Sequence, residues 1–251
     1  MDKQLIAERF AKARESYPRE ARAQQQIAKF MTTLLRAAFT GRRADSVLEV
    51  GCGTGIFSRM LLSILHPKEL WLNDLCPEME DSLHDLLQPG APARFLPGDA
   101  EEIDFPAGLQ LIASCSTLQW FSQPASFFAK CHCALASDGM LAFSTFGPHN
   151  LHEIRSITGN GLHYPTLDDL CRMLSPHFRL LHTEEDIIPL AFPTPVDVLK
   201  HLRQTGITGT EKRMWTRSRL NGFCDTYASR FSCKEGVTLT YHPIYIIATK
   251  Q

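Results

Sequence analysis

The chain has 251 residues, of which 44% are hydrophobic and 21% are charged, and its formal net charge at pH 7 is −1. This length allows one large α/β domain with an insertion, and the balanced charge gives no sign of nucleic-acid binding. No apolar run approaches the roughly 18 residues of a membrane span, and the charged N-terminus is not typical of a signal peptide. We therefore expect a cytoplasmic protein that binds no membrane and keeps its eight cysteines as thiols.

Helical patterns occupy the first 40 residues. Leu5, Phe10 and Ala13 recur at helical spacing, Pro18 interrupts the pattern, and a second apolar pattern runs over residues 21–39. We expect residues 1–40 to form a helical cap on the domain that follows.

The stretch from Val47 to Gly55 is the most informative part of the sequence. A short apolar run contains the acid Glu49, and glycines follow at alternate positions, beginning with Gly51 and Gly53. That order predicts a buried strand, a tight turn whose glycines can take positive φ, and then a helix. The spacing departs from the nucleotide-binding pattern G-x-G-x-x-G because the third glycine comes one position early. It resembles the first motif of class I S-adenosylmethionine methyltransferases, in which a carboxylate suits the ammonium and the sulfonium of the cofactor.

Polar residues follow the next three predicted strands. Asp74 comes about twenty residues after the glycine turn, where an ionised acid accepts hydrogen bonds from both hydroxyls of a ribose. Asp99 follows the third strand and Ser116 the fourth. A single acid of this kind is more often solvated or capping. Acids at three successive strands, with the glycine turn at the first, favour a cofactor site.

The complete pattern alternates strands and helices, which predicts one α/β domain over residues 1–251 with a helical insertion at 194–233, between strands six and seven. Cys131, His132 and Cys133 look metal-like, but neighbouring helix positions do not face one another, so we expect helix packing and no metal site. The strands are expected at residues 47–50, 70–74, 94–96, 109–115, 139–146, 178–190 and 238–249. The helices of the sheet region are expected at 56–65, 77–87, a short segment after 98, 124–136 and 166–174, and those of the insertion at 196–203 and 217–231.

Further motifs extend along the whole chain. In order they are Phe10 and Tyr17 with Gln24-Gln25-Gln26, the glycine motif, Asn73-Asp74-Leu75, Gly98-Asp99-Ala100-Glu101, Leu118-Gln119-Trp120, residues 199–206 and Leu239-Thr240-Tyr241-His242. Together they resemble the malonyl-acyl-carrier-protein O-methyltransferases of biotin synthesis. The cofactor motifs are common to many methyltransferases, so the specificity of the resemblance rests on residues 119–120, 199–206 and 240–242. The sequence departs from the family pattern at Asn73, where a small or apolar residue is common, and over residues 159–164.

The resemblance implies a Rossmann-like class I methyltransferase fold, with a seven-stranded, mostly parallel sheet and an antiparallel seventh strand. It implies S-adenosylmethionine as the methyl donor and S-adenosylhomocysteine as the product, with Asp99 at the adenine. The residues expected to bind this cofactor are Glu49, Gly51, Gly53, Gly55, Asp74, Leu75, Asp99, Ala100 and Ser116.

The implied reaction moves the methyl group onto the free carboxylate of a malonyl thioester. A carboxylate with a pKa near 4 is ionised at neutral pH, so no general base is expected. Catalysis then consists of alignment and the exclusion of water. The candidates for positioning are Tyr17, Trp120, Tyr241 and His242, for which strand-end or core packing is the alternative. Arg155 and Arg203 are candidates for holding the substrate carboxylate or the thioester arm, with solvated surface arginines as the alternative.

The insertion carries a run of cations that suits an acidic carrier protein. Its candidate docking residues are Lys200, Arg203, Arg213, Arg217 and Arg219. Malonyl-CoA is the other substrate that this reading allows, and a solvated helix face is the other explanation of the charges. Two alternative functions remain open: methylation of another small carboxylic acid, and a non-methylating assembly factor. An assay of several substrates distinguishes the first alternative from methylation of a malonyl thioester. A titration with the cofactor distinguishes the second, because an assembly factor need not bind it.

Overall fold

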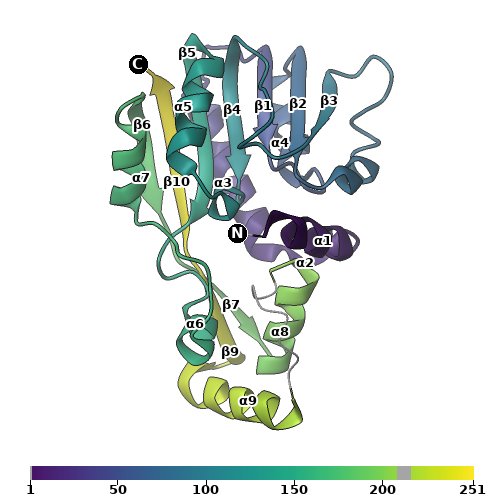
Figure 1. The fold of residues 1–251 in the computed structure, drawn as a ribbon, viewed down its shortest axis with the longest axis vertical. Coiled ribbons are helices and arrows are strands. Elements are labelled where there is room, and N and C mark those ends of the chain that lie inside the picture. The colour runs from purple at the N-terminus through teal and green to yellow at the C-terminus, as the bar shows by residue number, and fades with distance from the viewer. Residues whose placement is uncertain (1, 208–215) are drawn as a thin grey trace.

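A computed structural model describes residues 2–207 and 216–251. Its larger sheet has seven strands in the order β3-β2-β1-β4-β5-β10-β6 (Figure 1). The neighbours from β3 to β5 pair in parallel, whereas β10 pairs antiparallel with both β5 and β6. The expected seven-stranded sheet with one antiparallel strand is therefore confirmed. Its strands are β1 (Ser46–Val50), β2 (Glu69–Asp74), β3 (Ala93–Pro97), β4 (Leu109–Cys115), β5 (Leu135–Phe146), β6 (Phe178–Glu185) and β10 (Pro243–Lys250).

Helices cover both faces of this sheet, and each face has its own hydrophobic core. Successive strand residues point to opposite faces, so Val47 joins one core and Leu48 the other. One core packs α3 (Arg22–Ala38) and α4 (Ile56–Leu65), and the other packs α5 (Pro124–Ala134) and α7 (Leu167–Leu174). The central strands β1, β4, β5 and β10 are largely buried on both sides, whereas the edge strands β3 and β6 are partly exposed.

A second, three-stranded sheet lies below the first, in the order β7-β9-β8 (Figure 1). It corrects two predictions, because residues 178–190 and 238–249 each form two strands rather than one. Pro243, which has no N–H to donate, begins β10, and the preceding His242 separates it from β9. At the second break the alternation of apolar residues continues, so it could not reveal the change of sheet. The first break falls at the charged residues Glu184, Glu185 and Asp186, which the single predicted strand ran through. The lower elements are α6 (His152–Thr158), β7 (Ile188–Phe192), α8 (Pro195–Gln204), α9 (Arg217–Phe231), β8 (Ser232–Cys233) and β9 (Gly236–Tyr241).

Several predicted helices change in extent. The expected helix 77–87 is a short 3₁₀ helix, η1 (Pro77–Ser82), and the segment after Gly98 forms turns. Helix α6 was not predicted. Helix α7 begins with the expected capping box, in which the side chains of Thr166 and Asp169 bond each other's backbone N–H. The predicted insertion, residues 194–233, contains β8 in addition to its two helices, and β7 directly precedes it.

The N-terminal helices α1 (Lys3–Ala13) and α2 (Tyr17–Glu20) lie at the carboxyl ends of the parallel strands (Figure 1). Ligands of open α/β sheets bind at this edge. Within the described ranges, no helix has the length and apolar character needed to span a membrane.

Candidate active site

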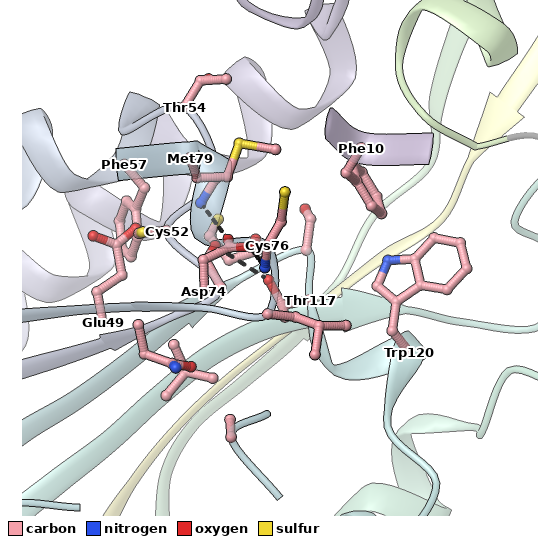
Figure 2. Close-up of a pocket in the computed structure, with 18 of the residues that line it drawn as sticks. Phe10, Glu49, Cys52, Thr54, Phe57, Asp74, Cys76, Met79, Thr117 and Trp120 are labelled. Atoms are coloured by element: carbon pink, nitrogen blue, oxygen red, sulfur yellow. Dashed lines mark hydrogen bonds between the residues drawn. The ribbon is translucent and has the colours of Figure 1, made fainter. Parts of the chain in front are cut away.

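A cavity of about 1120 Å³, including its open mouth, lies between helix α1 and the carboxyl ends of β1, β2 and β4. Figure 2 shows Glu49, Cys52 and Phe57 at one end, Asp74 in the middle, and Phe10 facing Trp120 at the other end. The cavity therefore has an acidic half and an aromatic half.

The glycine turn brings backbone to the cavity wall. Gly51 has φ +74°, and a Cβ there would lie 2.2 Å from the hydroxyl oxygen of Thr117. Gly53 has φ +51°, and a Cβ there would meet no atom within 4 Å. Both residues have the left-handed backbone that glycine adopts without strain. The first lets the turn pack against the loop after β4, and the second leaves room for a ligand.

Asp74 fixes the centre of the site. One of its carboxylate oxygens accepts the backbone N–H of Gly53 at 2.7 Å, and the other accepts that of Cys76 at 2.9 Å. Burial raises the pKa of this carboxyl to about 6, against the opposing effect of its backbone hydrogen bonds. The acid thus ties the glycine turn to the loop after β2.

Glu49 is 1% exposed, and its Oε2 has no hydrogen-bond partner in the protein. Burial raises the pKa of Glu49 to about 8. A buried carboxylate oxygen without a partner is costly, and a cationic ligand relieves that cost.

S-adenosylmethionine fits these residues. Its ammonium and sulfonium complement Glu49, and its ribose hydroxyls complement the acceptor oxygens of Asp74. The glycine turn leaves space beside the backbone for the chain that joins these groups. Of the other residues expected to bind the cofactor, Gly55 is the N-cap of helix α4 and has φ +80°. Residues Leu75, Asp99, Ala100 and Ser116 all line the cavity.

Helix α1 closes the cavity from the N-terminal side. Lys3 forms ion pairs with Asp99, at 2.5 Å, and with Glu101. At the other end of the helix, Arg14 donates to the carboxylate of Asp81 at 2.6 Å. Both ends of α1 are therefore attached to segments that follow strands of the sheet, the first end to the turns after β3 and the second to η1 after β2.

The aromatic half of the cavity lies under this helix. The ring of Phe10 packs edge-on against Trp120, with the ring centres 5.7 Å apart, and against Tyr17 at 6.4 Å. The positioning candidates Tyr17 and Trp120 thus line the same cavity as the acids.

The other positioning candidates lie outside that lining. Tyr241 is fully buried, and its hydroxyl lies 2.8 Å from Nε2 of His201. The ring nitrogens of His242 lie 3.1 Å from the backbone N–H of His149 and 3.3 Å from the carboxylate of Glu185. Both residues join the two sheets.

The arginine and lysine candidates also lie away from the cavity. The guanidinium of Arg155 donates to the carbonyl of Pro148 at 2.7 Å and stacks on Tyr164. The docking candidates on α8 and α9 have exposed side chains; they are Lys200, Arg203, Arg217 and Arg219. Arg213 lies outside the described residues.

The sequence did not single out several lining residues. Lys3 lines the cavity but was given no role from the sequence, and Gln24 was named only as part of a family motif. The lining residues Cys52, Cys76 and Cys115 were considered only as thiols. Helical spacing revealed the apolar face of α1, but not what that face covers. Burial raises the pKa of Cys52 well above its usual value, and those of Cys76 and Cys115 to about 12. All three thiols are therefore protonated at neutral pH.

The described residues contain no group of three or more His, Cys, Asp or Glu that could hold a metal ion. In helix α5, Cys131 is buried in the core while Cys133 is exposed, as helix packing requires.

Comparisons with known proteins agree with this architecture. Residues 48–143 match the family described as a methyltransferase domain. Among solved structures, the YcgJ protein of Bacillus subtilis superposes with a TM-score of 0.65 at 16% identity, over 89% of this chain and 99% of that one. The N-methyltransferase NodS of Bradyrhizobium japonicum, solved with S-adenosylhomocysteine, superposes with a TM-score of 0.54 at 13% identity. The superposition covers 88% of this chain and 86% of that one. At these identities the likeness concerns the fold alone.

Two curated relatives match over nearly their full length. The malonyl-[acyl-carrier protein] O-methyltransferase of Bacteroides helcogenes is 54% identical over 99% of this chain and 98% of its own. The enzyme of the same name from Haemophilus influenzae is 42% identical over 99% of this chain and 95% of its own. These matches include the helices of the insertion as well as the cofactor motifs. The chain belongs to the malonyl-[acyl-carrier protein] O-methyltransferase family.

Proposed function

We propose that this protein transfers the methyl group of S-adenosylmethionine to the free carboxylate of malonyl-acyl-carrier protein, giving the malonyl methyl ester from which pimeloyl and biotin synthesis starts. The observation that carries the proposal is the division of one cavity into two halves. Glu49 and Asp74 suit a cationic, ribose-bearing donor, and the aromatic half beside them suits an acyl acceptor. The full-length relatives of this name support the choice of acceptor.

The reaction destroys charge. S-adenosylmethionine supplies a methyl group on a positively charged sulfur, and the acceptor supplies a negatively charged oxygen. As the C–O bond forms and the C–S bond breaks, both charges disappear. Apolar surroundings stabilise the less charged transition state relative to separated ions. Phe10, Tyr17 and Trp120 provide such surroundings.

No proton has to be moved during this transfer, because the acceptor is already ionised. The described residues contribute by binding, alignment and the exclusion of water. Helix α1 covers the strand ends and excludes water from them, and the glycine turn fixes the donor's position. Correct alignment of two reactants supplies about 7–11 kcal/mol of the barrier reduction.

The proposed docking face consists of Lys200 and Arg203 on α8 with Arg217 and Arg219 at the start of α9; Arg213 belongs to the same stretch of sequence. This face adjoins the aromatic half of the cavity. The hydroxyl of Ser16, beside α1, donates to the carbonyl of Gln204 at the end of α8 at 2.8 Å. A Cβ on Gly206 would touch the ring of Phe10 at 2.8 Å. A carrier protein bound there would have its acyl arm next to the cavity. We place the enzyme in the cytoplasm, where its eight unpaired cysteines stay reduced.

A substrate panel tests the function. The purified protein is assayed with S-adenosylmethionine and malonyl-carrier protein, malonyl-CoA or free diacids, and the methyl esters are identified by mass spectrometry. We expect the carrier-bound substrate to have the highest kcat/KM. A preference for a free acid would assign the enzyme to another small carboxylic acid, and failure to bind S-adenosylmethionine would favour a non-methylating role.

Charge reversal tests the docking face. We expect Lys200→Glu, Arg203→Glu and Arg217→Glu together to raise the KM for malonyl-carrier protein about tenfold or more, because rim charges control the association rate. The KM for malonyl-CoA should change little. The wild-type KM for the carrier substrate should also rise with ionic strength, since charges are screened over about 8–10 Å.

A control variant reverses three exposed charges elsewhere, with Lys29→Glu, Arg36→Glu and Arg179→Glu. It should leave both KM values near those of the wild type. Equal effects of the two triple variants on malonyl-carrier protein would place the docking site elsewhere.

A further inference from the structure

We infer that the side-chain amide of Gln24 binds a carboxylate in the cavity and is held in place by Tyr241 and His201 behind it. The inference rests on the proposed function. Two carboxylates meet in this reaction, that of the malonyl acceptor and that of the cofactor's methionine part. Both have the same chemistry, and the experiment below distinguishes them.

Gln24 stands in the first turn of α3, on the wall of the cavity. Its side chain is 6% exposed, and its Oε1 has no hydrogen-bond partner in the protein. A buried amide with one end unpaired needs a ligand or a water there. Because Gln24 lines the cavity, a ligand bound there is the partner that the inference assigns to it.

The other end of the amide is bonded. The side chain of Gln24 hydrogen-bonds the hydroxyl of Tyr241, which in turn lies 2.8 Å from Nε2 of His201. Tyr241 is fully buried, and His201 is 2% exposed. Burial, with a smaller effect of the nearby Arg22 charge, lowers the pKa of His201 to about 4, so its ring is neutral at pH 7. The three side chains link helix α8 to the cavity.

This chain of hydrogen bonds can run in two directions. In one, Gln24 donates to the oxygen of Tyr241, and Tyr241 donates to Nε2 of His201. In the other, the Nε2–H of His201 donates to Tyr241, Tyr241 donates to Oε1 of Gln24, and the NH₂ of Gln24 faces the cavity. A neutral imidazole and a hydroxyl serve both arrangements, and an amide turns about its last bond. An ionised carboxylate only accepts hydrogen bonds, so it selects the second arrangement.

The charges around the cavity favour a neutral donor for this role. Among the described lining residues, the cations are Lys3 and Arg14, and both are held by acids. A neutral amide orients a carboxylate without cancelling its charge. An acceptor held in this way keeps the electron density that attacks the methyl group.

The test compares two glutamines on the same helix. Gln24→Glu preserves the shape and Oε1 but replaces the NH₂ donor with a negative charge, whereas Gln26→Glu makes the same change at an exposed position. Affinity for S-adenosylhomocysteine is measured by calorimetry, and KM and kcat are measured with malonyl-carrier protein. If Gln24 binds the acceptor, Gln24→Glu raises the KM at least tenfold and leaves S-adenosylhomocysteine affinity unchanged. If it binds the cofactor's carboxylate, the affinity falls at least tenfold. Gln26→Glu should change neither.

Gln24→Met removes the amide without adding charge and should cause a smaller loss of the same quantity. Tyr241→Phe removes only the positioning hydroxyl. It should change the same quantity as Gln24→Met, either the KM for malonyl-carrier protein or the affinity for S-adenosylhomocysteine, in the same direction. Combined with Gln24→Met it should add nothing further, because both changes interrupt one interaction. A purely structural role of Tyr241 would instead lower the Tm and give additive losses.

Three results overturn the inference. The first is a Gln24→Glu protein as active and as tight-binding as Gln26→Glu. The second is retention of binding in Gln24→Glu with loss in Gln24→Met, which would mean that the cavity uses the oxygen and not the NH₂. The third is a wild-type protein that methylates no malonyl thioester, with unchanged S-adenosylhomocysteine affinity in Gln24→Glu. In that third case the proposed function falls as well; if the wild type is active, the first two results remove the inference alone.

Discussion

At the scale of single residues, the two acids in the cavity are tuned by burial. The pKa of Glu49 is raised to about 8 and that of Asp74 to about 6. A raised pKa means that the folded protein prefers the protonated acid. Stability from this source is fully present below the ordinary pKa of about 4.5 and is lost as the pH rises through about 8. Near neutral pH, the burial of these two acids therefore lowers the stability of the folded protein when no cofactor is bound.

A cationic cofactor reverses this preference, because it stabilises the carboxylate of Glu49. We expect the affinity for S-adenosylmethionine to rise between pH 6 and pH 8 and to level off above about pH 8, with release of a proton on binding. Calorimetry in two buffers of different ionisation enthalpy measures that release. In Glu49→Gln the proton release should be smaller and the pH dependence flatter. An affinity that falls with pH in the wild type would contradict this assignment.

The contrast between Glu49 and Gln24 shows which site residues a sequence reveals. Glu49 could be predicted because it stands beside a glycine turn with a recognisable spacing. Gln24 stands in a run of three glutamines, and only its position on the helix decides which of them faces the cavity. The bond between Tyr241 and His201 joins residues 40 positions apart, so no local pattern indicates it.

At the scale of elements, helix α1 acts as a cover held by few contacts. Solvent-exposed ion pairs add little stability, so those of Lys3 and Arg14 hold the helix only moderately. Elements that move during ligand exchange are drawn from such weakly held segments. Because residues of α1 line the cavity, displacement of this helix would widen the cavity.

We therefore expect Lys3→Gln with Arg14→Gln to speed the dissociation of S-adenosylhomocysteine about three- to tenfold, since 1.4 kcal/mol corresponds to a factor of ten. Stopped-flow fluorescence of Trp120, which lines the cavity, follows the release. Lys12→Gln, an exposed change on the same helix, is the matched control. If the double variant and the control dissociate at the same rate, another element limits release.

The ends of helices and strands were predictable where turn or capping residues in the sequence mark the place at which the backbone changes conformation. Helices α4 and α9 were predicted with their observed limits. The left-handed residues Gly55 and His66 flank α4, and the side chain of Thr216 caps the start of α9. The break at His242 was not predicted, because apolar residues continue from β9 into β10 and the change of sheet depends on tertiary pairing. The step from β6 to β7 was missed for another reason, because the predicted strand ran through the charged residues Glu184, Glu185 and Asp186 that mark it.

At the scale of the whole molecule, β10 joins the sheet together. It pairs with β5 on one side and β6 on the other, and Ile246 at its centre is fully buried. We expect Ile246→Ala to lower the free energy of unfolding by about 2–5 kcal/mol, the usual cost of such a truncation in a core. Urea unfolding measures this loss. Leu181→Ala, on the edge strand β6 where the side chain is 43% exposed, should cost much less. Equal losses would mean that β10 is not central to stability.

The place of β10 has a consequence for synthesis. Strands β5 and β6 leave the ribosome before the strand that separates them, and 57 residues lie between Glu185 and Pro243. At about 5–20 residues per second, translation leaves a strand-wide slot in the nascent sheet for about 3–11 s. The unpaired edges on both sides of the slot are templates for any matching strand. A copy of β10 from a neighbouring chain matches as well as the chain's own, so crowded polysomes provide the conditions for two molecules to exchange this strand.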